Sequence, residues 1–132
     1  MVAPKAVKSG KTLGIESYHN AAGHLEKIEK VGSKSIKAYM DFRNIADAGF
    51  DVLKEMKILD SKNRCELHMK ENGTLLGQGT LPWKEITDLI YEMHYYGDDW
   101  MQIESAMPAK GNIVDSYKHN LLFLRELFSK PV

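Results

Sequence analysis

The chain has 132 residues, 43% hydrophobic and 27% charged, which suits a single globular domain. Its 18 basic and 18 acidic side chains cancel, so no nucleic-acid partner is expected. Cys65 is the only cysteine, which excludes an internal disulfide and favours a reducing, cytoplasmic location. No apolar run is long enough to span a membrane, and residues 1–12 lack the apolar segment of a signal peptide, so no membrane partner is expected.

The first half of the chain alternates apolar runs with amphipathic segments. Residues 12–17 (TLGIES) predict a short strand, and 20–31 predict a helix that begins at Asn20. Residues 36–42 (IKAYMDF) predict a second strand, and apolar side chains at helical spacing predict a helix over 46–59.

The second half repeats this alternation. Residues 65–70 (CELHMK) predict a third strand, which a glycine-bearing loop over 71–80 follows. A helix is predicted from Pro82 to about residue 93, because proline suits the first helical turn. Residues 100–105 (WMQIES) predict a buried fourth strand, and a last helix is predicted from about residue 112.

Strands that alternate with helices predict an α/β fold with a parallel sheet, which is either doubly wound or part of a (β/α)8 barrel. In both folds the carboxyl ends of the strands meet at one face, where active sites lie. The residues at the strand ends therefore carry the functional information.

Each predicted strand ends on or near an ionisable side chain: Glu16, Asp41, His68 and Glu104. A single carboxylate at such a position usually caps a helix, and a single histidine is usually a core residue. Three carboxylates at one face would repel one another without a cation. The repetition in all four units therefore predicts a metal site.

Four segments resemble the second half, strands five to eight, of the xylose isomerase-like TIM barrels, which are sugar phosphate isomerases and epimerases. They are LGIES (13–17), YMDFRN (39–44), ELHMKENGTLLGQG (66–79) and MQIES (101–105). The resemblance covers nearly the whole chain. It implies that residues 1–132 form a single domain, a (β/α)4 half of a TIM barrel with parallel strands and the helices outside.

The resemblance also implies a chemistry. Glu16, Asp41, His68 and Glu104 would coordinate one divalent metal, with Mn²⁺ favoured, Mg²⁺ or Co²⁺ as further options and Zn²⁺ less favoured. The substrate would be a small sugar or sugar phosphate, and protons would move through a metal-bound enediolate. Glu16 and Glu104 match the acid/base pair of the family.

The same pattern suggests substrate contacts, each with a structural alternative. They are Asn44, Lys70, Glu71, Gly77 and Gly79. Asn44 would alternatively cap the following helix, Lys70 and Glu71 would be an exposed loop pair, and the glycines would serve only the turn. The remaining histidines, His19, His24, His94 and His119, have no evident partners.

Three departures from the family stand out. No arginine follows His68 before Arg125, the segment MHYYGDDW (93–100) is lengthened, and the first four strands are absent. A half-barrel leaves two free strand edges and an inner face that we expect to be apolar. The first and fourth strands of a flat sheet would lie about 14 Å apart, at roughly 4.8 Å per neighbour, so a shared metal requires a curved sheet.

We therefore expect a homodimer or larger assembly, or a complement of the missing N-terminal half, which would close the barrel. A truncated gene product is an alternative origin of the half-barrel. The leading functional hypothesis is a metal-dependent isomerase or epimerase. The alternatives are a catalytically inactive half-barrel that self-associates and an endonuclease IV-like DNA repair protein, against which the zero net charge argues.

Overall fold

The computed structural model describes residues 2–93, 100–104 and 106–129. Its strands are β1 (Leu13–Ile15), β2 (Ile36–Asp41), β3 (Arg64–Lys70) and β4 (Trp100–Glu104). Its helices are α1 (Ala3–Ser9), α2 (Ala21–Val31), α3 (Phe42–Asp47), α4 (Val52–Ile58), α5 (Trp83–Glu92) and α6 (Ile113–Leu127). In this part of the chain no helix is long and apolar enough to cross a membrane.

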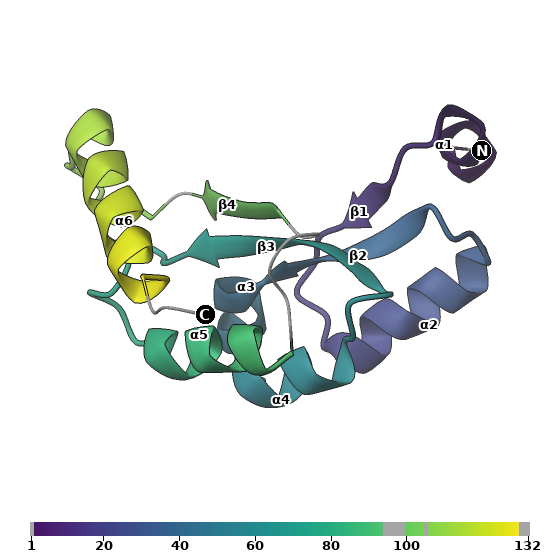
Figure 1. Cartoon of the computed structure of the whole chain (residues 1–132), viewed down its shortest axis with the longest axis horizontal. Coiled ribbons are helices and arrows are strands. Elements are labelled where there is room, and N and C mark those ends of the chain that lie inside the picture. Colours follow the sequence, from purple (N-terminus) through teal and green to yellow (C-terminus); the bar gives the residue numbers. More distant parts are fainter. Residues whose placement is uncertain (1, 94–99, 105, 130–132) are drawn as a thin grey trace.

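The four strands form one parallel sheet in the order β1-β2-β3-β4, which confirms the predicted α/β class. Helices α2, α4 and α5 cover one face of the sheet, and all strands point toward the end where α6 stands (Figure 1). The register pairs Asp41 of β2 with His68 of β3, and Lys70 of β3 with Glu104 of β4. Side chains from three strands are thereby aligned at one end of the sheet.

The hydrophobic core lies between the sheet and its helices. Met40 of β2 and Leu67 of β3 point toward them and are fully buried, as is Met56 of α4. Strand residues alternate between the two faces, so the intervening side chains lie on the opposite face. Those are Lys37, Tyr39, Glu66, Trp100 and Gln102, together with the residues of the candidate site. Apart from Trp100 this face is polar, so the expectation of an apolar inner face is wrong, because the apolar residues of β2 and β3 pack against the helices.

Two helices differ from the prediction. The helix expected over 46–59 is split into α3 and α4, and α3 begins directly after β2 at Phe42. Gly49 has a φ of 83°, a left-handed conformation that interrupts the helix, and the Asp51 side chain accepts a hydrogen bond from Lys54 N at 3.1 Å to begin α4. Helix α1 was not predicted, because its seven residues are mostly polar or small.

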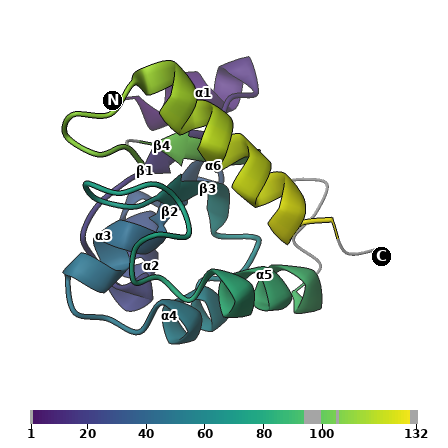
Figure 2. The same cartoon turned by 90° about the vertical axis from the view of Figure 1, so that its left-hand side faces the viewer.

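Strand β4 is an exposed edge in this chain, so the prediction of a buried strand is wrong. Trp100 is 77% exposed because it lies on the uncovered face of the sheet, and Met101 is exposed because β4 pairs only with β3 among the described strands. Helix α6 runs diagonally beside the sheet in Figure 2, and it contacts β4 and α5. Its exposed side carries further large apolar residues: Ile113, Val114, Tyr117, Leu121 and Leu122. Exposed apolar residues therefore lie both on β4 and on α6.

Candidate metal centre

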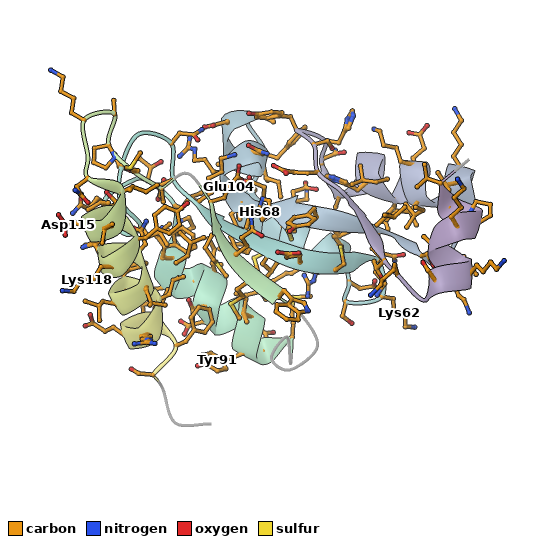
Figure 3. The ribbon with its side chains drawn as sticks, turned by 90° about the horizontal axis from the view of Figure 1, so that it is seen from above. Lys62, His68, Tyr91, Glu104, Asp115 and Lys118 are labelled. Carbon is orange, nitrogen blue, oxygen red and sulfur yellow. The ribbon has the colours of Figure 1, made fainter. Side chains whose placement is uncertain are left out.

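The four strand-end residues lie together at the carboxyl end of the sheet. Asp41 is the last residue of β2, Glu104 is the last residue of β4, and Glu16 directly follows β1. His68 lies within β3, two residues before its end. Figure 3 shows His68 and Glu104 side by side on the face of the sheet that the helices leave uncovered.

One oxygen or nitrogen atom from each residue lies within 4.8 Å of the others, so the cluster can hold a metal ion. His68 Nδ1 is at its centre, 3.1 Å from Glu104 Oε2, 3.6 Å from Asp41 Oδ2 and 3.7 Å from Glu16 Oε1. Glu16 and Glu104 come from the first and last strands, which confirms that the sheet is curved rather than flat.

The cluster contains buried polar atoms without a hydrogen-bond partner among the described residues. They are Asp41 Oδ2, Glu104 Oε2 and both ring nitrogens of His68. Asp41 Oδ2, Glu104 Oε2 and His68 Nδ1 meet one another and Lys70 only in ion-pair contacts of 3.1 to 3.6 Å, so these buried atoms can take a further partner at the point where they converge. Three carboxylates and one imidazole suit a divalent cation with mainly oxygen ligands. The residues present therefore fit the metal that the sequence predicted.

The charges of the cluster shift its ionisation. Burial lowers the pKa of His68, but Asp41, Glu16 and Glu104 outweigh burial and raise this pKa above 6.5. Burial raises the pKa of Asp41, but His68, the backbone N–H of Asn44 and Lys70 outweigh burial and lower this pKa below 3.8. Both shifts favour the charged forms, because a protonated His68 supplies the positive charge that a metal ion would otherwise supply among the carboxylates.

Two of the predicted substrate contacts lie at the cluster. Asn44 donates from Nδ2 to Glu16 Oε1 at 3.2 Å, and Lys70 Nζ lies 3.4 Å from Asn44 Oδ1. Asn44 does not cap the next helix. Instead Asp41 caps α3, because its Oδ1 accepts a hydrogen bond from Asn44 N at 2.8 Å while its Oδ2 faces the cluster. The two oxygens of Asp41 thus have separate functions.

The other three predicted contacts are engaged within the loop over 71–83. Glu71 is buried and accepts hydrogen bonds from Trp83 Nε1 at 3.0 Å and Leu81 N at 3.4 Å. Gly77 packs closely against the ring of Phe123, and Gly79 against the carboxylate of Glu71. No hydrogen bond or ion pair seen in the described part of the chain joins these three residues to the metal cluster. These contacts are structural ones, but the alternative of an exposed loop residue is wrong for Glu71, which is 1% exposed because it accepts hydrogen bonds inside the loop.

Sequence reasoning missed the role of Tyr39 in the site. Its ring lies edge-on to the ring of His68, with centroids 4.1 Å apart, and its hydroxyl is 3.5 Å from Gln102 Oε1. The signal was its position two residues before Asp41, which places both on one face of β2. Burial, and then Glu66, raises the pKa of Tyr39, so the hydroxyl stays protonated.

Two histidines without evident partners in the sequence do have partners in the structure. His24 Nε2 lies 3.0 Å from Ser17 Oγ, and His119 Nε2 lies 3.2 Å from the carbonyl oxygen of Leu76. His94 and most of the segment MHYYGDDW lie outside the described residues.

No protein-family model and no curated protein sequence matches this chain. Solved structures do match it. An L-ribulose 3-epimerase has a TM-score of 0.80 at 21% identity, over 97% of this chain and 50% of the other. A D-psicose 3-epimerase has a TM-score of 0.78 at 17% identity, over 98% and 53%. A xylose isomerase domain protein from Planctomyces limnophilus has a TM-score of 0.73 at 16% identity, over 97% and 49%.

This chain has the fold of half a xylose isomerase-like TIM barrel. It spans about half of the length of each matching structure, as the 50%, 53% and 49% coverages show. The half-barrel that the sequence predicted, with parallel strands and helices outside, is confirmed.

Proposed function

We propose that this half-barrel carries the metal site of a divalent-metal-dependent sugar or sugar-phosphate isomerase or epimerase. The observation that carries the proposal is the convergence of Glu16, Asp41, His68 and Glu104 on one point at the carboxyl end of the strands. The solved structures that share this fold include an L-ribulose 3-epimerase and a D-psicose 3-epimerase. Mn²⁺ is the metal that we favour for this ligand set.

The burial of the four residues suggests a division of labour. The side chains of Asp41 and His68 are 0% and 5% exposed, so they are suited to holding the ion from the buried side of the site, next to the sheet. Those of Glu16 and Glu104 are 39% and 31% exposed, so they alone also face the space where a substrate would lie. A divalent ion here would bind substrate oxygens and polarise a carbonyl group.

Proton transfer is then the task of the two exposed glutamates. One removes the proton beside the carbonyl and the other returns a proton, which relocates the carbonyl or inverts the carbon. Asn44 holds Glu16 through its side-chain amide, and the ammonium group of Lys70 can donate a hydrogen bond to a substrate oxygen. Each role is assigned to an atom that already lies at the cluster.

The open face of the site calls for a second half. Among the described residues β1 and β4 each pair on one side only, so they are free parallel edges, and β4 exposes Trp100 and Met101. We propose that a second copy of the chain, or a polypeptide that supplies the other half of the barrel, covers this face and completes the substrate pocket.

The first test of the metal site is calorimetry. Mn²⁺ is titrated into the chelated protein, and we expect micromolar or tighter binding that Glu104→Gln weakens at least tenfold. Glu29→Gln, an exposed glutamate on α2, is the matched control and should bind as the wild type does. Absence of binding tighter than about millimolar, or equal affinities in the wild type, Glu104→Gln and Glu29→Gln, would contradict the proposed metal site.

The second test is a screen of ketoses and ketose phosphates with the metal-loaded protein. We expect turnover that both Glu16→Gln and Glu104→Gln abolish, since either change removes one proton carrier. A correctly loaded and folded protein that turns over none of these substrates would contradict the enzymatic function and leave a binding scaffold.

A further inference from the structure

Glu16 is the one residue of the cluster that lies outside the strands. It lies one residue beyond β1, in the irregular segment 16–20 that leads into α2. Its Oε1 accepts one hydrogen bond, from Asn44 Nδ2. The backbone before it is fixed, because Ile15 pairs with Ala38 of β2. The position of its carboxylate therefore depends on what holds the chain immediately after it.

A buried histidine holds that point. His24, in the first turn of α2, is 3% exposed, and its Nε2 lies 3.0 Å from Ser17 Oγ. Its Nδ1 lies 3.2 Å from the carbonyl oxygen of Asn20, so Nδ1 donates and Nε2 accepts the Ser17 hydroxyl proton. Ser17 Oγ in turn accepts from His19 N at 3.3 Å. The ring thus ties both ends of the segment together.

The start of α2, which carries the His24 ring, is itself fixed by hydrogen bonds. The Asn20 side chain accepts a hydrogen bond from Gly23 N at 2.9 Å, which caps α2. The buried Glu55 of α4 accepts one from Ala21 N at 2.6 Å, which fixes the start of α2 against the core. Burial lowers the pKa of His24, so the ring stays neutral and keeps the lone pair that accepts from Ser17.

We propose that His24 is a positioning residue, which acts through Ser17 to hold Glu16 at the metal cluster. Its hydrogen bonds reach the residue that follows Glu16 and the cap that ends the Glu16 segment. A histidine with a purely structural role would stabilise α2 without affecting Glu16. The inference rests on the proposed function only in taking Glu16 as a ligand and proton carrier.

The test uses two readouts and a matched control. His24→Leu removes both ring hydrogen bonds at similar volume, His24→Gln keeps an acceptor for Ser17, and His119→Leu removes a histidine bonded to a distant carbonyl. In the metal-free protein, amide exchange over 16–20 should rise about tenfold in His24→Leu, with β2 and β3 unchanged. His24→Gln should restore part of the protection, and His119→Leu should leave the segment as in the wild type.

The second readout is a double-mutant cycle on Mn²⁺ affinity. His24→Leu should weaken binding about tenfold, the size typical of residues that orient ligands, and should cost nothing further in a Glu16→Gln background. Unchanged exchange over 16–20, or an equal loss in both backgrounds, would overturn the inference. If His24→Leu does not fold, Ser17→Ala provides the same two measurements. If the wild type binds no Mn²⁺, the proposed function fails, and exchange in the metal-free chain still decides the positioning role.

Discussion

Lys70 Nζ lies 3.2 Å from Asp41 Oδ2 and 3.2 Å from Glu104 Oε2, so an ammonium group stands between two carboxylates of the cluster. Burial lowers the pKa of Lys70, but these two carboxylates outweigh burial and raise it above 10.5. Lys70 therefore stays charged, stabilises the metal-free cluster and repels an incoming cation.

Replacement of Lys70 should accordingly change stability and metal affinity in opposite directions. We expect Lys70→Met to lower the free energy of unfolding of the chelated protein by about 1 to 3 kcal/mol, because the buried carboxylates lose a charged partner. Mn²⁺ binding should tighten about tenfold, equivalent to about 1.4 kcal/mol. Urea unfolding and calorimetry measure the two effects. Lys84→Met, which removes an exposed pair with Asp88, is the control and should change neither quantity appreciably.

The metal-free chain should lose stability as the pH rises above about 6.5. The pKa of His68 is raised on folding, so its protonated form contributes full stabilisation below the unfolded value of 6.5 and loses it as the pH rises through the folded pKa. Mn²⁺ requires the neutral ring, so metal affinity should increase over the same window.

Unfolding free energies of wild type and His68→Gln, measured from about pH 6 to pH 9, check this prediction. The difference between the two proteins is the informative quantity, because the pKa of His24 is lowered by burial and its contribution has the opposite sign. Asp41 remains ionised throughout, since its pKa is lowered below 3.8. A difference that does not shrink with rising pH would contradict the assigned environment of His68.

Gly79→Ala should destabilise the loop over 71–83. A Cβ at this position would collide with the carboxylate of Glu71, which accepts hydrogen bonds from Trp83 Nε1 and Leu81 N. We expect a loss of about 1 to 3 kcal/mol in unfolding free energy, the cost of overpacking a tight site, and altered Trp83 fluorescence. Gly73→Ala is the comparison, because its φ of 73° strains alanine while nothing lies within 4 Å of the added Cβ. Because Gly79 has no left-handed φ, an undiminished stability of Gly79→Ala would contradict the close contact with Glu71.

The chain should associate in solution. Light scattering at micromolar concentration should give a mass above the 15.0 kDa of one chain, since association covers the β4 edge and the apolar side of α6. Leu122→Lys on α6 should shift the protein toward monomer, whereas Ile58→Lys, an exposed apolar residue on α4, should not. A wild-type particle of 15.0 kDa that unfolds cooperatively would contradict this assembly.

The sequence by itself determined the order of the four strands, the parallel sheet and the four residues of the cluster. These follow from local patterns, because apolar runs define strands, and helical connections between them require parallel pairing. Once the strands are parallel, a residue that ends each strand must lie at the common end of the sheet. The positions of Asp41, His68 and Glu104 could therefore be inferred without coordinates.

Other features depended on which residues meet through space. The polar inner face could not be read from the composition of β2 and β3, because the core side of each strand is set by where the helices pack. The exposure of Trp100 follows from its place in an edge strand on the uncovered face of the sheet, which the apolar run WMQIES does not reveal. The pairing of His24 with Ser17 required the turn between β1 and α2 to bring them together. Only the tertiary structure decided these features, because they depend on distances between segments that the local sequence pattern does not contain.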